Sequence, residues 1–251
     1  MNQPTLREWI ADRPFSLALS SGFFGFFAHA GMLSALEDEG SLPEQTCGSS
    51  AGALIAGAWA AGVNAETIGS VLCELRRPDF WDPRPGLGLL RGALFRQRLE
   101  QLLPTRRFSA TRVPVCVSVF DLFERRTTVL RSGDLAAAIH ASCAVPLLFQ
   151  PVWIDGHPLV DGGVADRPGI AGLAADSRVL FHHLSSKSPW RRKAPPIPTR
   201  PSLTALIIEG LPRLGPFSLE RGELAFEKAR RATRQALSRT LNHLGHVCVE
   251  A

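Results

Sequence analysis

A serine within a run of very small residues has the setting that acyl-transfer chemistry needs. The stretch TCGSSAGALIAGAWAAG spans residues 46–62, and in it Gly48, Ser50 and Gly52 spell G-x-S-x-G. This pattern is typical of a nucleophilic serine on a sharp turn between a strand and a helix, where neighbours without bulk are required. Similar runs also occur where a helix packs closely on a sheet, so the motif alone leaves both interpretations open.

A nucleophilic serine needs a base for its proton and donors for the oxyanion that forms on the attacked carbonyl. Asp161, in the sequence VDGG, follows an apolar pair and precedes two glycines, which predicts a carboxylate at the end of a strand. An ordinary Asp-Gly turn would have the same sequence. Ser21 and Gly22 follow the first predicted strand, where free backbone N–H groups could face the same cleft.

Two successive units of strand, glycine turn and helix would position these groups. The first has an apolar strand at 15–20 and a helix at 26–39. The second has a brief strand at 45–47, the turn at 48–52 and an Ala-rich helix that stops at Gly62. Units of this kind in series predict an α/β fold, in which helices cover both faces of a sheet.

The remaining elements are predicted from shorter signals. Residues 78–104 form a Pro/Gly-rich loop followed by a short amphipathic helix. Two β-branched runs, 114–120 and 127–131, predict strands, and Asp134 is a plausible N-cap for a helix at 135–142.

The composition fits a single globular domain. The chain has 251 residues, of which 45% are hydrophobic and 20% charged, and it contains no uninterrupted apolar run of about 18 residues. Glu8 and Asp12 precede the first apolar stretch, which is unlike a secretory leader, so we expect a cytoplasmic protein. The five cysteines are widely spaced without a C-x-x-C pair, so neither disulfides nor a metal site is predicted.

The net charge of +5 is concentrated after residue 184, where Lys and Arg outnumber Asp and Glu. Residues 219–244 predict a basic helix, which could lie on an anionic membrane, peripheral to its inner face, or pack on the domain. In the membrane interpretation the apolar contacts are Leu224, Phe226, Leu237, Leu241 and Leu244, and the head-group contacts are Arg230, Arg231, Arg234 and Arg239. Without a nucleic-acid motif or interleaved aromatics, nucleic acid is not an expected partner.

Four motifs occur together and in order: SGFFGFFAHAG at 21–31, GSSAG at 48–52, ASCAVPLLFQP at 141–151 and DGG at 161–163. In their order and approximate spacing they resemble the patatin-like phospholipases. The resemblance covers about residues 15–168. It implies a three-layer α/β/α sandwich with a mostly parallel sheet. It also implies a lipid acyl hydrolase, a lipase or phospholipase A-type esterase, that uses a Ser-Asp dyad and no cofactor.

Carried over position by position, the resemblance makes Ser50 the nucleophile and Asp161 its base. The other site residues it implies are Ser21, Gly22, Phe23 and Ala51 as backbone donors of the oxyanion hole, Gly48 and Gly52 in the nucleophile turn, and Pro146, Gly162 and Gly163 as active-site support. It also divides the chain into a catalytic core at 1–184 and, at 185–251, a Pro/Arg-rich segment and basic helix packed on or appended to that core.

The glycine-rich loop departs from the family pattern. The family has three glycines, a variable residue, an Arg or Lys and another glycine, whereas residues 21–26 read SGFFGF and lack the cation. Because a Phe strongly resists positive φ, we expect the loop to be shaped differently or its glycines to be redistributed. Phe23, Phe24, Phe26, Phe27, Trp81 and residues 87–95 could line an acyl-chain channel or belong to the ordinary core.

Two rivals to the dyad remain open at this point. The order Ser50, Asp161 and then His182 or His183 matches the Ser-Asp-His order of an α/β-hydrolase triad. The other rival is a non-catalytic or partner-activated lipid-binding protein on the same fold, which the altered loop and the basic tail would suit. His29, by contrast, is interpreted as a packed helix residue.

Overall fold

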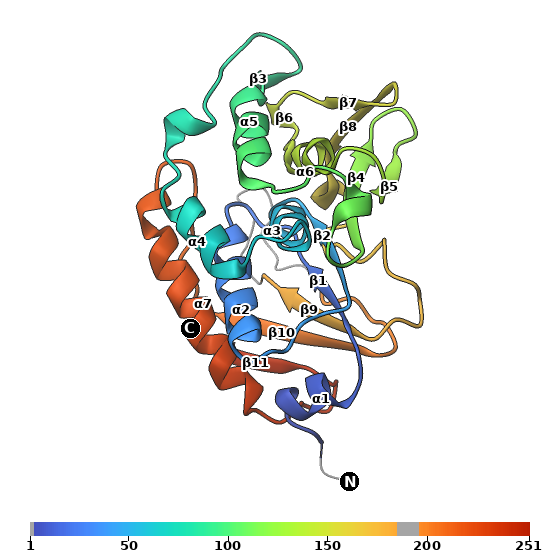
Figure 1. Ribbon diagram of the computed structural model, residues 1–251, viewed down its shortest axis with the longest axis vertical. Helices are drawn as coiled ribbons and strands as arrows, with labels where there is room; N and C mark the ends of the chain where they lie inside the picture. Colours follow the sequence, from blue (N-terminus) through green and yellow to red (C-terminus); the bar gives the residue numbers. More distant parts are fainter. Residues whose placement is uncertain (1–2, 185–195) are drawn as a thin grey trace.

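The computed structural model describes residues 3–184 and 196–251, and its centre is a nine-stranded sheet (Figure 1). From one edge to the other the strands are β11 (Val247–Glu250), β10 (Leu203–Glu209), β9 (Val179–His183), β1 (Ser16–Leu19), β2 (Gln45–Ser49), β4 (Val115–Asp121), β8 (His157–Asp161) and β7 (Val152–Ile154), while β5 (Arg126–Leu130) also pairs with β4. The strands from β11 to β4 run parallel, and β5, β7 and β8 are antiparallel to their neighbours. The expectation of an α/β fold with a mostly parallel sheet is confirmed.

Helices account for most of the remaining regular structure. The α-helices are α1 (Leu6–Asp12), α2 (Phe26–Asp38), α3 (Ala51–Ala60), α4 (Ala65–Cys73), α5 (Ala93–Leu102), α6 (Leu135–Cys143) and α7 (Gly222–Leu237), and the 3-10 helices are η1 (Arg77–Asp79), η2 (Phe108–Ala110), η3 (Gly162–Val164) and η4 (Leu219–Arg221). A separate small sheet pairs β3 (Gly88–Leu90) with β6 (Leu147–Phe149). As predicted, Asp134 caps α6, because its side chain accepts the Ala137 N–H.

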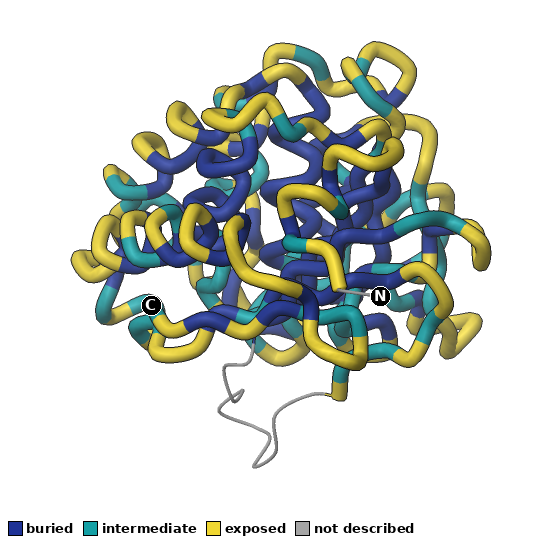
Figure 2. Tube along the Cα trace, turned by 90° about the horizontal axis from the view of Figure 1, so that it is seen from below, coloured by how far each residue is buried: buried dark blue, intermediate teal, exposed yellow. Residues whose placement is uncertain are grey.

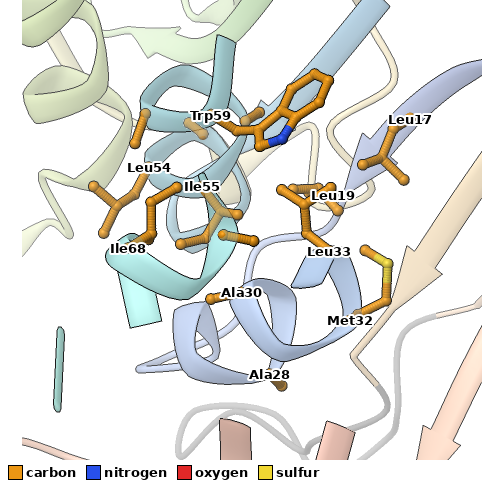
Figure 3. Close-up of a cluster of buried hydrophobic side chains, with 14 of the residues drawn as sticks. Leu17, Leu19, Ala28, Ala30, Met32, Leu33, Leu54, Ile55, Trp59 and Ile68 are labelled. Atoms are coloured by element: carbon orange, nitrogen blue, oxygen red, sulfur yellow. The ribbon is translucent and has the colours of Figure 1, made fainter. Parts of the chain in front are cut away.

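The two predicted strand, turn and helix units form the middle of the molecule. β1 is buried along its whole length because it lies between β2 and β9, which explains its uninterrupted apolar sequence. The main hydrophobic core lies between one face of the sheet and helices α2 and α3 (Figure 3). There Leu17 of β1, Met32 of α2 and Trp59 of α3 are almost completely buried. The buried trace follows the strands and inner helices, and exposure is concentrated at the turns (Figure 2).

The opposite face of the sheet has a second, smaller core. Its members Ala18, Cys47, Cys116, Phe181 and Ala205 come from five adjacent strands. In the described part of the chain they are covered by the turns that carry Ile170, Leu173 and Ile197, with no α-helix contributing to this cluster. The layer over this face is therefore irregular, whereas the layer over the first face is helical.

The sheet continues beyond the predicted core boundary at residue 184. β10 and β11 form one edge of the same sheet, and neither was predicted. The expected basic helix at 219–244 is shorter than predicted, because α7 ends at Leu237 and the chain then turns to add β11. Of the Pro/Arg-rich segment, residues 185–195 lie outside the described residues.

α7 packs its apolar face against α2, so three of the five predicted apolar membrane contacts are not available to lipid, whereas Leu224 and Leu244 are exposed. Phe226, Leu237 and Leu241 are buried in the main core. The approach is close, since a Cβ on Gly31 would lie 2.1 Å from the Phe226 carbonyl oxygen. Arg230 and Arg234 both pair with Asp38 of α2. The interpretation of this helix as a membrane surface is corrected by this packing.

Candidate active site

Ser50 occupies the single residue between β2 and α3, where it is the N-cap of α3. Its backbone has φ 54° and ψ −120°, a conformation that L-residues rarely adopt and that stores strain. The flanking glycines permit this turn. A Cβ on Gly48 would lie 2.4 Å from Gly52 backbone atoms, and one on Gly52 would lie 2.0 Å from the Leu19 carbonyl oxygen.

The Ser50 hydroxyl meets a buried carboxylate. Its Oγ donates to Oδ2 of Asp161 at 2.6 Å, across 111 residues of sequence. The Gly163 N–H donates to the other oxygen, Oδ1, at 2.7 Å. Burial nevertheless raises the pKa of Asp161 to about 6, because the desolvation of the carboxylate outweighs these two hydrogen bonds. A carboxylate with this pKa is ionised near neutral pH and is a better base than an exposed aspartate.

The two glycines after Asp161 keep the neighbouring segments close. A Cβ on Gly162 would lie 2.1 Å from the Ser118 carbonyl oxygen. One on Gly163 would lie 2.6 Å from the Ser21 Oγ, so this position joins the loop after β1 to the end of β8. Larger residues here would displace the Asp161 carboxylate from Ser50.

Three backbone N–H groups are free to act as donors beside Ser50. In residues 3–184 and 196–251 the N–H groups of Gly22, Phe23 and Ala51 have no hydrogen-bond acceptor. All three residues line the same pocket as Ser50. Ala51 is also the first residue of α3, where the helix dipole favours negative charge. The inclusion of Ser21 among the donors is corrected, because its N–H already donates to the Arg167 carbonyl oxygen at 2.8 Å.

The Phe-rich loop takes a shape that we did not expect. Phe24 itself adopts φ 54°, whereas Gly25 has an ordinary φ of −78°. The rings hold Phe24 in place, with centroid distances of 4.9 Å to Phe23, 5.4 Å to Phe26 and 6.1 Å to Phe80. Aromatic packing thus maintains a conformation that glycine would adopt without strain.

Ser142 supports the nucleophile turn and was not identified from the sequence. Its Oγ accepts the Ser50 N–H at 2.8 Å and donates to the Ser118 carbonyl oxygen at 2.6 Å. The neighbouring Cys143 donates its thiol to the Ser50 carbonyl oxygen at 3.2 Å. The ASCAVP motif was the signal for both residues, although the resemblance assigned them no role. Pro146 from the same motif is exposed and does not line the pocket.

Asp166 is a second buried carboxylate near the site, but its oxygens are already occupied. Oδ2 accepts the Ser118 hydroxyl at 2.6 Å and the Ala171 N–H at 3.0 Å. Oδ1 accepts the N–H groups of Gly169 and Ile170. Asp166 therefore ties β4 to the turn that follows η3, and Asp161 is the carboxylate that faces Ser50.

The histidines form a separate buried pair. His29 Nε2 donates to the Ser20 carbonyl oxygen at 2.7 Å, so its Nδ1 accepts a hydrogen bond from the Nδ1–H of His182 at 2.8 Å. Burial lowers the pKa of His29 to about 4 and that of His182 well below its ordinary value. In the described structure neither His182 nor His183 has a hydrogen bond to Ser50 or Asp161, so the Ser-His-Asp alternative has no geometric support.

An apolar pocket of about 700 Å³, measured out to its open mouth, lies over Ser50. Its lining is Gly22, Phe23, Phe24, Phe26, Ser50, Ala51, Leu54, Leu75, Phe80, Trp81, Leu90, Phe95, Cys143, Val145, Leu148, Phe149 and Pro216. Phe27, a predicted lining residue, is instead fully buried in the core, and Leu87 and Leu89 are exposed. A groove between α4 and α5 shares Leu54, Leu75 and Phe95 with the pocket.

Residues 3–184 and 196–251 contain neither a candidate metal site nor a candidate membrane-spanning helix. No group of three or more His, Cys, Asp or Glu side chains there is placed to hold a metal ion. No helix in these ranges combines the length and the apolar character that crossing a bilayer requires.

Comparisons with known proteins identify the family of the chain. The family model for patatin-like phospholipases matches residues 17–174. An uncharacterized NTE family protein of Mycobacterium tuberculosis is 29% identical over 198 residues, which is 76% of this chain and 55% of that protein. A patatin-like phospholipase domain-containing protein of Caenorhabditis elegans is 30% identical over 175 residues, 63% of this chain and 12% of that protein. The chain thus spans about half or less of the length of these relatives.

A solved structure gives the same result for the fold. VipD from Legionella pneumophila superposes with a TM-score of 0.57 at 16% identity, over 77% of this chain and 50% of that chain. The matched family model covers both Ser50 and Asp161 and more than half of the sequence. The resemblance seen in the four motifs is confirmed: the chain belongs to the patatin-like phospholipase family.

Proposed function

We propose that the protein is a serine acyl hydrolase that cleaves the acyl esters of lipids through a Ser50–Asp161 dyad. The observation that carries this proposal is the 2.6 Å hydrogen bond from the Ser50 hydroxyl to a buried carboxylate beneath an apolar pocket. Family membership supports the same class of reaction.

In the first half-reaction Asp161 takes the Ser50 proton as Oγ attacks the ester carbonyl carbon. The N–H groups of Gly22, Phe23 and Ala51 stabilise the negative oxygen of the tetrahedral intermediate. The ester bond then breaks, and protonated Asp161 gives its proton to the departing alcohol. In the second half-reaction Asp161 deprotonates a water molecule that attacks the acyl-enzyme, and the proton returns to Ser50 as the carboxylic acid leaves.

The pocket lining supports an acyl chain as the group that binds beside Ser50. Aromatic and aliphatic side chains surround the nucleophile, which suits a hydrocarbon chain and disfavours a charged group. The adjoining groove between α4 and α5, measured out to its open mouth in the same way, has a volume of about 1530 Å³ and shares part of its wall with the pocket. We infer that long acyl chains fit this site better than short ones.

Labelling with an alkyl fluorophosphonate, read by intact mass, tests the dyad. The wild type is expected to label and to hydrolyse p-nitrophenyl butyrate, whereas Ser50→Ala and Asp161→Asn lose both activities. Ser49→Ala is the matched control, because Ser49 is the adjacent buried serine and its hydroxyl has no partner in the described residues. Normal turnover by either dyad variant would contradict the assignment.

A second candidate is a lipid-binding protein that is non-catalytic or depends on a partner for activation. The observation that favours it is the SGFFGF loop, which lacks the cation of the family pattern. On this hypothesis the wild type remains unlabelled, while the pocket still binds a fluorescent fatty acid. Labelling of the isolated wild type would exclude it.

A further inference from the structure

The mouth of the pocket carries an exposed apolar rim, which consists of Leu87, Leu89, Leu147 and Phe217. Leu147 is 80% exposed, Leu87 77%, Phe217 74% and Leu89 50%. Leu89, Leu147 and Phe217 are each adjacent in sequence to a pocket-lining residue, namely Leu90, Leu148 and Pro216. Large apolar side chains this exposed are ordinary when scattered singly, but a group around one opening marks an interaction surface.

The rim belongs to a well-defined part of the fold. Gly88 of β3 pairs with Leu147 of β6, which brings the backbone that carries Leu87 and Leu89 beside the backbone of Leu147. The Arg84 N–H donates to the Leu89 carbonyl oxygen at 2.9 Å, closing the loop before β3. This loop lies with β3, β6 and α5 at one end of the molecule (Figure 1). Backbone hydrogen bonds therefore fix the segment that carries these exposed leucines.

Leu147 is unusual in its backbone as well as in its exposure. It has φ 69°, a left-handed conformation that is strained for a residue other than glycine. In the described structure the side chain gains no burial in return. A strained and exposed leucine at the entrance to a site points to an interaction made outside this chain.

Positive charge accompanies the apolar rim. Arg77, Arg84 and Arg91 are exposed, and none forms an ion pair with a carboxylate in the described part of the chain. Arg77 also stacks over Phe217, with its guanidinium carbon 5.4 Å from the ring centroid. The acidic residue within this loop, Asp82, accepts the N–H groups of Gly92 and Leu94 at the start of α5.

We propose that this rim docks on a lipid bilayer with anionic head groups, so that the pocket mouth opens directly into the membrane surface. Exposed leucines and a phenylalanine enter the boundary between head groups and acyl chains, while the unpaired arginines contact phosphate groups. The delivery of an acyl chain to Ser50 rests on the proposed function, but the docking itself does not. This location replaces α7, whose apolar face is already covered.

Vesicle binding by the full chain tests the proposal, and Ser50→Ala is used as the background so that hydrolysis cannot alter the lipid. The probes are vesicles of phosphatidylcholine containing phosphatidylglycerol, compared with pure phosphatidylcholine, in a sedimentation assay. The background protein is expected to bind the anionic vesicles more tightly than the neutral ones. Adding Leu87→Ser and Leu147→Ser lowers the affinity about a hundred-fold, because each buried leucine contributes roughly ten-fold.

Arg84→Gln with Arg91→Gln separates the charge from the apolar contribution. Each arginine near an anionic surface contributes about five-fold, so this pair lowers the affinity by about twenty-fold at low salt. This loss of affinity disappears at high salt, because salt then screens the attraction between the arginines and the head groups in the background protein as well. Matched controls are Leu42→Ser with Leu244→Ser and Arg231→Gln with Arg239→Gln, which alter exposed residues outside the rim and leave binding unchanged.

Three outcomes would overturn the docking proposal. The first is a background protein that does not bind anionic vesicles, and the second is an equal loss in the control variants. The third is a concentration-dependent dimer that the leucine variant dissociates without any vesicle binding, which would assign the rim to a second copy of the chain. Fluorophosphonate labelling of the wild type reports separately on the proposed hydrolase, so failure of one proposal does not imply failure of the other.

Discussion

The two turns at the centre of the molecule have the same order of elements but different functions. Each follows a parallel strand and precedes a helix, and each contains one residue other than glycine at φ 54°, Phe24 in the first and Ser50 in the second. The second turn is a single residue and presents a side chain. The first spans residues 20–25 and presents backbone N–H groups.

The neighbours of their glycines explain this difference. Gly48 and Gly52 face backbone atoms, which cannot move without displacing a strand or a helix. Gly22 faces the end of the Leu184 side chain, at 2.5 Å from an added Cβ, and a side chain of this kind can change rotamer. The turn that carries Ser50 is therefore fixed by backbone packing, while at Gly22 in the turn at residues 20–25 a side-chain neighbour can adjust.

The largest expected effect comes from Ser50→Gly, which removes the side chain and relieves the strained φ together. Ester hydrolysis should fall at least about 1,000-fold, because no other group on this turn can form the acyl-enzyme. The free energy of unfolding should rise by about 1 kcal/mol, because glycine adopts positive φ without strain. Turnover assays and urea unfolding of the same preparation measure both. A fall in stability would show that the Ser50 hydrogen bond outweighs the strain.

A pair of alanine substitutions compares the two turns directly. Gly52→Ala should lower the free energy of unfolding by about 3 kcal/mol or more, because its Cβ meets the Leu19 carbonyl oxygen at 2.0 Å. Gly22→Ala should cost about 1 kcal/mol, since only the tip of Leu184 must move. Equal losses in chemical denaturation would contradict the distinction between backbone and side-chain neighbours.

Low pH should affect the second turn and not the first. Residues 20–25 contain no ionisable side chain, whereas the activity of Ser50 depends on the ionisation of Asp161. With a pKa of about 6, Asp161 becomes protonated in mild acid. The value of kcat/KM should therefore fall about ten-fold for each pH unit below that pKa. A rate that stays constant down to the ordinary aspartate pKa of 3.8 would exclude Asp161 as the base.

The raised pKa of Asp161 also predicts how the free energy of unfolding depends on pH. Rising pH should increase activity but decrease stability. Because the folded protein holds the Asp161 proton more tightly than the unfolded chain, the free energy of unfolding falls as pH rises from 3.8 to about 6. Asp161→Asn lacks this ionisation and should be up to about 3 kcal/mol more stable than wild type in neutral solution. In acid below both pKa values the two proteins should converge, and thermal unfolding across this range is the measurement.

The smallest effect is expected for Phe24→Gly. Relief of positive φ should stabilise the fold, but loss of the ring contacts to Phe23, Phe26 and Phe80 opposes it, which leaves a net change of less than about 1 kcal/mol. Turnover should stay within about three-fold of wild type, since the Gly22 and Phe23 N–H groups remain. A large loss of activity with normal stability would show that the aromatic loop itself positions these donors.

The sequence predicted the elements around Ser50 because their signals are local. An apolar strand, a glycine turn and an Ala-rich helix are readable within 46–62, and the DGG motif indicated Asp161. The sequence did not indicate β9 and β10, because these strands pair with strands that are distant in sequence. The basic residues after 219 extended the predicted helix too far, because charge alone does not show where a helix ends.

Tertiary context decided the rest of the site. The N-cap position of Ser50 and the free N–H groups are consequences of local geometry, but the Ser21 N–H was lost as a donor only because Arg167 lies opposite it. Phe24 has a positive φ although residues other than glycine prefer a negative one. The aromatic contact with Phe80 from another loop stabilises this conformation. Such contacts join residues that no short window of sequence contains.

The position of β1 has a consequence for how the chain reaches its native state. β1 pairs with β9 on one side, and the Ser20 hydroxyl bonds to His182 across 162 residues of sequence. The strand that leads into residues 20–25 therefore cannot complete its hydrogen bonding until the residues of β9 have been synthesised. Folding dominated by such distant pairings is slow and leaves apolar strands exposed for longer. The N-terminal unit is consequently the part of a nascent chain that most needs protection from aggregation.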